Sequence, residues 1–542
     1  MSHSHVSHSD DSPRQERPRS HPGHRGRAPG AVRRAAAVAA AVLLTATACS
    51  GSSTGGSGSG DGTLTVVSAS PPASLDPAKA NVGSDNWFVN LTYDTLLRLG
   101  PNGQLEPDLA TRWGYVGTGN TVFDLTIRQG VTFSDGTPVT AQAVAASLDY
   151  VRRSGLNVSW TSAISSVTAT GPDTVQIRCS TPNPDLPGLL DQVSLVGSVI
   201  SPAGLADPAK MGTQSFGAGP YVLDAAQTVA GDHYTYTPNP DYWNKSTIHW
   251  KRVVIKVVAN PDSALQAVQT GQAAAVGITA AQVPTATAAG LKVDYSPVAF
   301  MGVNLADRDG TVAKPLASLQ VRQALNYAVD RNAIARALFQ EYGAPTDEIS
   351  IPGQQGYAPD DENQYPYNPA KARQLLAAAG YPHGFALNVE DLQGQGLDLL
   401  TQAVLQDWKQ IGVTTDVTTD TTVGQWLSNA VSRKYPALGF AYGAAPAYLL
   451  SLDWMLPHTT AFNPFATSDP TLTAMLARAD AAPAAEQPAL DQDAMRYVVG
   501  QAWFVSVARL DGIFAYSGSE ITGFDVSPGN LLPDIAWTVS PK

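Results

Sequence analysis

The chain has 542 residues, of which 43% are hydrophobic and 15% charged, so it can bury a large core and is too long for one ordinary domain. We expect two or three domains. The formal net charge of −12 at pH 7 argues against a nucleic-acid partner, because phosphate contacts need a basic stripe. An acidic secreted protein is the simpler interpretation.

The N-terminal residues predict a cleaved export signal followed by a tether. An apolar, Ala-rich run over 35–48 ends directly before Cys49. It is shorter than the ~20 apolar residues that cross a bilayer as a helix, and it fits the core of a signal peptide. Gly and Ser dominate residues 50–62, which is typical of a flexible linker. We therefore predict a signal peptide over 1–48 and a tether over 49–62.

The two cysteines have different predicted roles. Ala46-Thr-Ala-Cys49 resembles a lipoprotein cleavage site, in which the Cys receives lipid, although Ala46 stands where the usual residue is Leu. A plain secretory signal with an incidental Cys is the alternative. If Cys49 carries lipid, no disulfide can form within the chain. Cys179 lies in an alternating run that predicts a half-buried structural thiol on a strand.

The segment from Trp87 to Arg153 changes its hydrophobic period several times. Near-helical spacing from Phe88 to Leu97 predicts a helix, and near-alternation over 122–127 predicts a strand. Thr140 is a plausible N-cap for a helix whose apolar stripe comprises Val144, Leu148 and Val151. Further strands are predicted over 63–70, 221–223, 252–258, 414–419 and 503–509. Further helices are predicted over 261–271, 321–334, 368–380 and 399–412. Asp330 is the predicted cap within 321–334, and Asn368 is the predicted N-cap of the helix over 368–380.

Several motifs occur in an order that is similar to one protein family. They are Tyr93-Asp-x-Leu-Leu, Gly103-x-Leu-x-Pro-x-Leu-Ala-x-x-Trp113, a strand, and Phe133-Ser-Asp-Gly-Thr-Pro-Val-Thr140 before a helix. Later come Phe216-Gly-Ala-Gly-Pro-Tyr221, Asn239-Pro-Asp-Tyr-Trp243 and the helix pair that begins at Val321. This order resembles the family 5 extracellular solute-binding proteins of dipeptide, oligopeptide and nickel ABC importers.

The resemblance implies an α/β, two-lobed periplasmic-binding-protein-like fold of type II, in the peptide-binding cluster, with an extra small domain. The implied domains are the following: domain I over 63–100, 209–303 and 503–542, domain II over 101–208, and domain III over 304–502.

Motifs that would indicate an enzyme are weak in this sequence. Gly51-Ser-Ser-Thr-Gly55 matches the G-x-S-x-G pattern, but it lies in the tether with no strand before it. The four His residues beyond the leader, at 233, 249, 383 and 458, lack metal-ligand spacing, and Asp360-Asp361 reads as a solvated loop. We therefore predict a protein that is not an enzyme and that needs no cofactor or metal.

The main hypothesis is a substrate-binding lipoprotein on the extracytoplasmic face of the cell membrane. It would be a monomer without a nucleic-acid partner, close two lobes over a peptide or peptide-like solute, and deliver it to the permease subunits of an ABC transporter. Three alternatives remain open: a secreted hydrolase such as a peptidase or glycosidase, an adhesion lipoprotein, and a binding protein for a sugar or metal chelate.

The identity of the solute is the least determined feature. Peptide-binding members of the family carry an acidic residue that pairs with the ligand's amino terminus, but here the matching run from Leu438 has no acid until Asp453. This departure makes an ordinary zwitterionic peptide doubtful.

The resemblance places a set of aromatic and apolar residues and one cation at the ligand cleft: Phe300, Met301, Trp426, Arg433, Phe440 and Tyr442. Core packing is the alternative for each aromatic residue, and a solvated surface position is the alternative for Arg433. The sequence hypothesis predicts that Trp426→Ala melts close to wild type and loses solute binding.

Overall fold

The computed structural model describes residues 62–154, 158–394, 396–528, 530 and 532–542. The predicted signal peptide, Cys49 and all of the tether except Gly62 lie outside the described residues. Within the described part, residues from Gly62 onward belong to one compact unit.

An 11-stranded mixed sheet forms the main layer of the fold. Its strand order is β15-β14-β16-β12-β17-β11-β1-β10-β9-β8, and β13 pairs separately with β17. The strands of this sheet have the following bounds: β1 (Thr63–Ser68), β8 (Tyr221–Leu223), β9 (His233–Pro238), β10 (Arg252–Val257), β11 (Ala275–Ile278), β12 (Lys292–Leu305), β13 (Gly343–Pro345), β14 (Ala386–Leu392), β15 (Thr414–Asp420), β16 (Ala437–Gly443) and β17 (Phe504–Tyr516).

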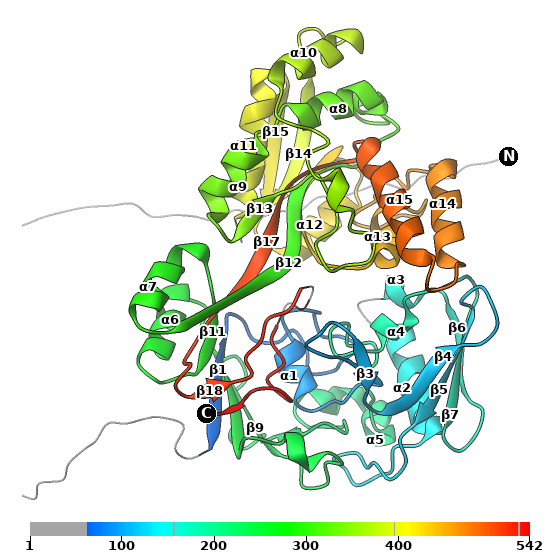
Figure 1. Cartoon of the computed structure of the whole chain (residues 1–542), viewed down its shortest axis with the longest axis vertical. Coiled ribbons are helices and arrows are strands. Elements are labelled where there is room, and N and C mark those ends of the chain that lie inside the picture. Colours follow the sequence, from blue (N-terminus) through cyan, green and yellow to red (C-terminus); the bar gives the residue numbers. More distant parts are fainter. Residues whose placement is uncertain (1–61, 155–157, 395, 529, 531) are drawn as a thin grey trace, which may run out of the picture. The chain divides into compact units, whose positions relative to one another are not determined.

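Two long strands, β12 and β17, pair with each other in an antiparallel ladder and run through two lobes (Figure 1). We call residues 62–291 together with 517–542 the first lobe and residues 306–503 the second lobe. The ladder has register shifts at Pro297/Ala299 and Met301/Gly302. Because a bulge bends a strand and increases its twist, these shifts mark where the sheet changes direction between the lobes.

The first lobe carries a second, four-stranded antiparallel sheet with the order β4-β5-β7-β6. Its strands are β4 (Ala110–Tyr115), β5 (Val122–Ile127), β6 (Ile164–Ala169) and β7 (Thr174–Cys179). Cys179 is partly buried on β7, and burial raises the pKa of its thiol to about 11, which disfavours the nucleophilic thiolate. Two-stranded sheets complete the β structure: β2 (Leu97–Leu99) with β3 (Leu105–Pro107), and β18 (Ile521–Thr522) with β19 (Ser540–Pro541).

The helices cover both lobes. Those of the first lobe are α1 (Asn86–Asn90), α2 (Ala141–Ser154), α3 (Val158–Thr161), α4 (Leu186–Leu189), α5 (Pro202–Ala206), α6 (Pro261–Gln269) and α7 (Val283–Ala288). Those of the second lobe are α8 (Leu319–Tyr327), α9 (Arg331–Phe339), α10 (Pro369–Ala378), α11 (Leu397–Gln410), α12 (Val423–Ala430), α13 (Ala447–Trp454), α14 (Pro470–Asp480) and α15 (Gln487–Gly500).

The predicted helix caps are confirmed. The side chain of Asp330 accepts a hydrogen bond from the N–H of Ala333 at 3.0 Å, and that of Asn368 accepts one from Lys371, also at 3.0 Å. Thr140 accepts from the N–H of Ala143 at 3.2 Å. Each bond satisfies a donor that the first turn of a helix leaves without a partner.

One prediction near the start of the chain is wrong. The helix expected from Phe88 to Leu97 ends at Asn90, and Leu97 begins strand β2 instead. Leu97 is opposite Pro107 in the β2–β3 pair, and its side chain is fully buried. Burial in this hairpin therefore outweighs the helical spacing of the apolar residues.

Candidate functional site

Six aromatic side chains meet where strands β12, β16 and β17 pass helix α13, and we call them the aromatic cluster: Phe300, Phe440, Tyr442, Trp454, Phe462 and Phe504. The Trp454 and Phe462 rings are stacked with centroids 4.4 Å apart, and the Phe440 ring lies 4.9 Å from Trp454. Phe300 and Phe440 are each 1% exposed. The cluster is therefore packed tightly and is largely out of solvent.

Strand alternation explains why these side chains share one face. Phe440 and Tyr442 are two residues apart on β16, so they point to the same side of the sheet. Phe300 lies directly opposite Tyr442 in the antiparallel β12–β16 pair. Met301, the next residue on β12, points to the other side and packs in a separate core with Val303. Met301 consequently does not join the aromatic cluster.

The carboxylate of Asp453 lies against the cluster. The Tyr442 hydroxyl donates to Asp453 Oδ2 at 2.6 Å, and the Trp160 indole Nε1–H donates to the same oxygen at 3.3 Å. Asp453 is 8% exposed. Burial and the adjacent Asp453 carboxylate both raise the pKa of Tyr442, so its hydroxyl stays protonated and remains a donor.

The contact between Trp160 and Asp453 joins the lobes, because Trp160 belongs to α3 and Asp453 to α13. Apolar packing follows the same path. Leu189 and Leu195 of the first lobe belong to one buried cluster with Tyr448 and Trp454 of the second lobe. The region around Asp453 is thus a junction between the lobes, lined by aromatic rings and one buried acid.

The structure places Trp426 beside the aromatic cluster. It lies on α12, is 5% exposed, and packs in a small core with Tyr435 and Leu438. Its ring centroid is 5.6 Å from that of Phe462. This burial favours a packing role and changes the expected result of Trp426→Ala.

Arg433 lies on the surface. It lies three residues beyond the end of α12 with a positive φ of 59°, and its guanidinium donates to the Thr459 hydroxyl at 3.1 Å. The next residue, Thr460, donates to the backbone carbonyl of Asp453. Arg433 therefore lies near the segment that supports Asp453, and no contact with the aromatic rings is observed for it among the described residues.

Sequence reasoning missed several residues of this junction. Asp453 was named from the sequence without a role in binding, and Trp454, Phe462 and Trp160 were not named as site residues. The sequence signal for Asp453 is that it is the first acidic residue after the start of the matching run at Leu438. Trp160 had no such signal, because it comes from the other lobe.

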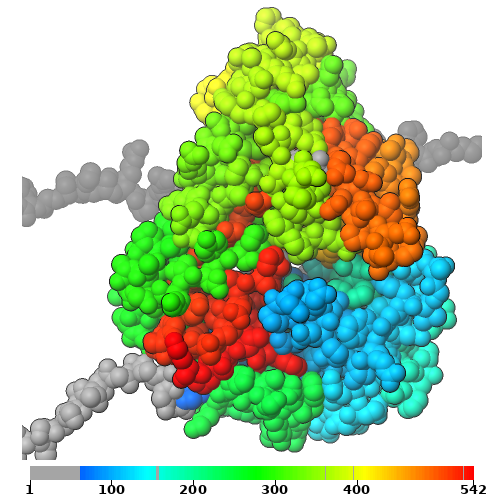
Figure 2. Space-filling view, viewed as in Figure 1, coloured from blue at the N-terminus to red at the C-terminus, as the bar shows by residue number. Residues whose placement is uncertain are grey.

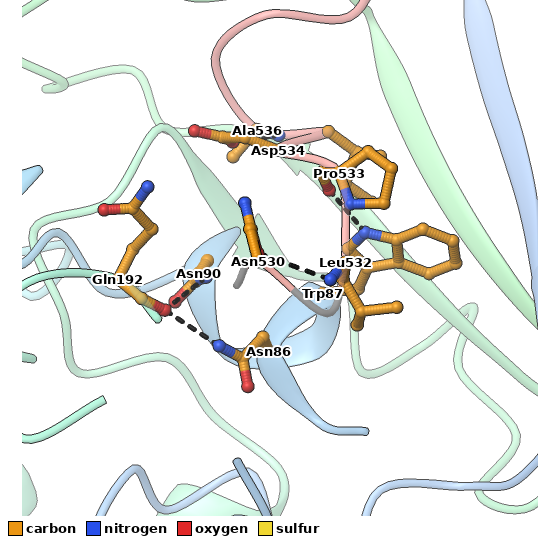
Figure 3. A pocket seen from close by; sticks show the side chains of 10 residues that line it. Asn86, Trp87, Asn90, Gln192, Asn530, Leu532, Pro533, Asp534 and Ala536 are labelled. Atoms are coloured by element: carbon orange, nitrogen blue, oxygen red, sulfur yellow. Dashed lines mark hydrogen bonds between the residues drawn. The ribbon is translucent and has the colours of Figure 1, made fainter. Parts of the chain in front are cut away.

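A small polar hollow lies elsewhere, between α1 and the C-terminal segment of the first lobe (Figure 3). The amides of Asn86 and Asn90 donate to the Gln192 carbonyl, and the Trp87 indole donates to the Pro533 carbonyl at 2.6 Å. The cavity volume is about 10 Å³, which is room for about one water molecule. The Trp87 bond attaches the C-terminal segment to α1, and the two Asn bonds attach α1 to the segment that contains Gln192. The hollow is too small for a solute.

The described residues contain no group of three or more His, Cys, Asp or Glu side chains that could hold a metal ion. Outside the undescribed N-terminal region and the short gaps, none of the helices combines the length and the apolar character that crossing a bilayer requires.

Comparisons with known proteins agree with this architecture. The family model described as "Bacterial extracellular solute-binding proteins, family 5 Middle" matches residues 104–462. The glutathione-binding protein GsiB of Shigella boydii is 29% identical over 362 residues, which are 64% of this chain and 67% of GsiB.

Two solved structures cover 89% of this chain. The periplasmic binding protein DppA of Helicobacter pylori, in complex with peptide STSA, aligns with a TM-score of 0.73 and 19% identity over 98% of its chain. The binding protein AgaA of A. tumefacien R10, in complex with agropinic acid, aligns with a TM-score of 0.74 and 23% identity over 99% of its chain. These similarities confirm the predicted α/β periplasmic-binding-protein fold.

Proposed function

Because the chain belongs to the family 5 bacterial extracellular solute-binding proteins, we propose that it captures a peptide-like solute between its lobes and delivers it to an ABC permease. Membership in this family makes the chain an extracytoplasmic solute-binding protein of an ABC importer and not an enzyme. The chemical class of the solute, the residues that bind it and the membrane anchor are parts of the proposal.

The observation that carries the proposal is the Asp453 carboxylate at the lobe junction. It is buried beside Tyr442 and Trp454, and its known protein partners there are neutral donors, the Tyr442 hydroxyl and the Trp160 indole. A carboxylate offers about four acceptor positions, so it can accept a further donor. We assign the amino group of the solute to Asp453.

The proposed solute class also draws on the relatives. GsiB is named for binding glutathione, and the DppA structure contains the peptide STSA. Both ligands are peptides with polar ends. Phe300, Phe440, Tyr442 and Trp426 would line or support the apolar part of the site, and Arg433 would lie at its rim.

We further propose that the mature protein is a monomer held at the outer face of the cell membrane by lipid on Cys49. The small residues before Cys49 and the Gly/Ser-rich segment after it support this assignment. A tether of this composition would let the folded lobes reach a permease in the same membrane.

The test is a thermal-shift and calorimetric comparison of free-amine peptides, their N-acetylated forms and glutathione. A solute that binds only the native state raises its stability by RT ln(1+[L]/Kd), about 2.7 kcal/mol at a hundredfold excess over Kd. We expect free-amine peptides to bind more tightly than the acetylated forms. Asp453→Asn should remove this preference, with a loss of about 10- to 100-fold in affinity for the free amine.

Asp416→Asn is the matched control, because Asp416 is an exposed acid on β15 of the same lobe. It should bind like wild type. Equal affinity of wild type for free and acetylated peptides would contradict the role assigned to Asp453.

A second candidate is a solute without a free amine. It is favoured by the two donors that already occupy Asp453 Oδ2. The AgaA structure, with agropinic acid, shows that this fold also accommodates ligands that are not simple peptides. In that case acetylated and amine-free compounds would bind and Asp453→Asn would leave their affinity unchanged.

A further inference from the structure

A loop of the four-stranded sheet reaches from the first lobe to the second. The β4–β5 connection contains Gly117, Gly119 and Asn120, all with positive φ, and Asn120 has φ of 50°. The side-chain amide of Asn120 donates to the backbone carbonyls of Asp480 at 2.8 Å and Ala482 at 3.0 Å. A single side chain thus makes two hydrogen bonds between the lobes.

One acceptor, Asp480, is the last residue of a helix, and the other, Ala482, lies two residues beyond its end. Helix α14 ends at Asp480, and the last carbonyls of a helix have no partner within it. They also form the negative end of the helix dipole, which favours a donor such as an amide. Asn120 therefore caps a helix of the other lobe.

The loop that presents Asn120 is held in place on its own side. The Asn120 carbonyl accepts a hydrogen bond from the N–H of Asn183 at 3.0 Å, and Asn183 is fully buried. Asn is one of the few residues other than Gly that tolerates a left-handed backbone conformation. The backbone of Asn120 is therefore held within the first lobe, independently of its side-chain bonds to the second lobe.

The surroundings show that this is a true junction of the lobes. Figure 2 shows the α14–α15 surface, in orange, directly against the cyan surface of the four-stranded sheet. Nearby, the buried Tyr448 of the second lobe has its pKa raised by burial and by Asp480, Cys179 and Asp185, groups that come from both lobes. Asn120 lies at the edge of this packed region.

We propose that Asn120 is a closing latch, a positioning residue that fastens the four-stranded sheet to the C-terminal end of α14 and sets the balance between closed and open lobes. The inference rests on the proposed function, because closure matters only if the lobes enclose a solute. The latch acts without touching the solute. In an open form, water replaces the Asn120 amide at these carbonyls. The two hydrogen bonds therefore stabilise the closed form relative to the open form by a modest net amount.

The latch is tested by small-angle X-ray scattering of the protein without added solute, comparing wild type with Asn120→Gly and Asn120→Asp. Glycine accepts the positive φ and removes the donor, while Asp keeps the backbone preference and replaces the donor with an acceptor. Both variants should shift the scattering toward a more open form, with a closed-to-open ratio reduced about tenfold.

The matched control is Asn363→Gly, since Asn363 is exposed and also has a positive φ of 76°. It should scatter like wild type. Far-UV circular dichroism of every variant checks that the fold is retained.

Two outcomes would overturn the latch: Asn120→Gly scattering like wild type, or Asn120→Gly opening while Asn120→Asp does not. A parallel titration with glutathione separates this proposal from the proposed function. Absence of any binding by wild type would count against the peptide-like solute, while the scattering would still decide whether Asn120 holds the lobes together.

Discussion

Trp426→Ala is the substitution that best separates core packing from a ligand-lining role. The indole ring is 5% exposed on the inner face of α12, and its Nε1 has no hydrogen-bond partner among the described residues. Burying a large aromatic ring removes about 200 Å² from water, worth about 5 kcal/mol at 25 cal/mol per Å². Because no hydrogen bond is lost, we expect a destabilisation of about 4 kcal/mol, within the range for Trp→Ala in cores.

The assay is thermal unfolding of Trp426→Ala beside Val423→Ala. Val423 lies on the same helix with 59% of its side chain exposed, so its truncation should change stability by less than about 0.5 kcal/mol. A loss of about 4 kcal/mol should lower the melting temperature by roughly 4 °C, because a single compact unit of this size unfolds with an entropy of about 1 kcal/mol per K. If Trp426→Ala melts like Val423→Ala and loses only solute binding, the reasoning from burial is refuted and Trp426 lines the cleft, as the sequence predicts.

Three further predictions concern the anchor, pH and a buried ion pair. Cys49→Ala should move the protein from the membrane fraction to the medium, and a variant that stays membrane-bound would contradict lipidation. Burial, with the Asp491 carboxylate nearby, raises the pKa of Asp480 to about 7 in the folded chain. The protonated Asp480 side chain therefore contributes its full stability below about pH 3.8, and this contribution is lost as pH rises through 7. Asp480→Asn should flatten this part of a profile of melting temperature against pH. Asp347→Ala leaves the buried guanidinium of Arg331, 2.6 Å from the Asp347 carboxylate in wild type, without that carboxylate. Unfolding in urea should show a free energy of unfolding that is lower by about 3–5 kcal/mol. Asp493→Ala, which removes the acid of an exposed ion pair with Arg496, should lower it by less than about 1 kcal/mol.

Local chemistry explains which elements could be predicted from the sequence. A cap such as Asn368 or Asp330 acts on a backbone N–H three residues away, so the whole interaction is contained in a short segment. The stripe of Val144, Leu148 and Val151 is buried on α2 for the same reason, because helical periodicity alone brings these residues to one face. The order of such segments was sufficient to predict the fold and the family.

Phe440 and Tyr442 were selected from the sequence, but no strand was predicted there; the shared face of the two side chains follows once β16 is known, because alternation along a strand is local. Alternation also places the consecutive residues Phe300 and Met301 of β12 on opposite faces of the sheet. Only the tertiary structure decided which of these two faces packs into the aromatic cluster and which packs into the core that contains Val303.

The contacts between the lobes were beyond sequence reasoning. Trp160 reaches Asp453 across 293 residues of chain, and Asn120 reaches Asp480 across 360. No periodicity or cap relates residues so far apart, because their meeting depends on the path of two long strands through both lobes and on the packing of whole domains. Local sequence therefore determined the elements and their order, while the docking of the lobes determined which acid and which amide lie at the junction.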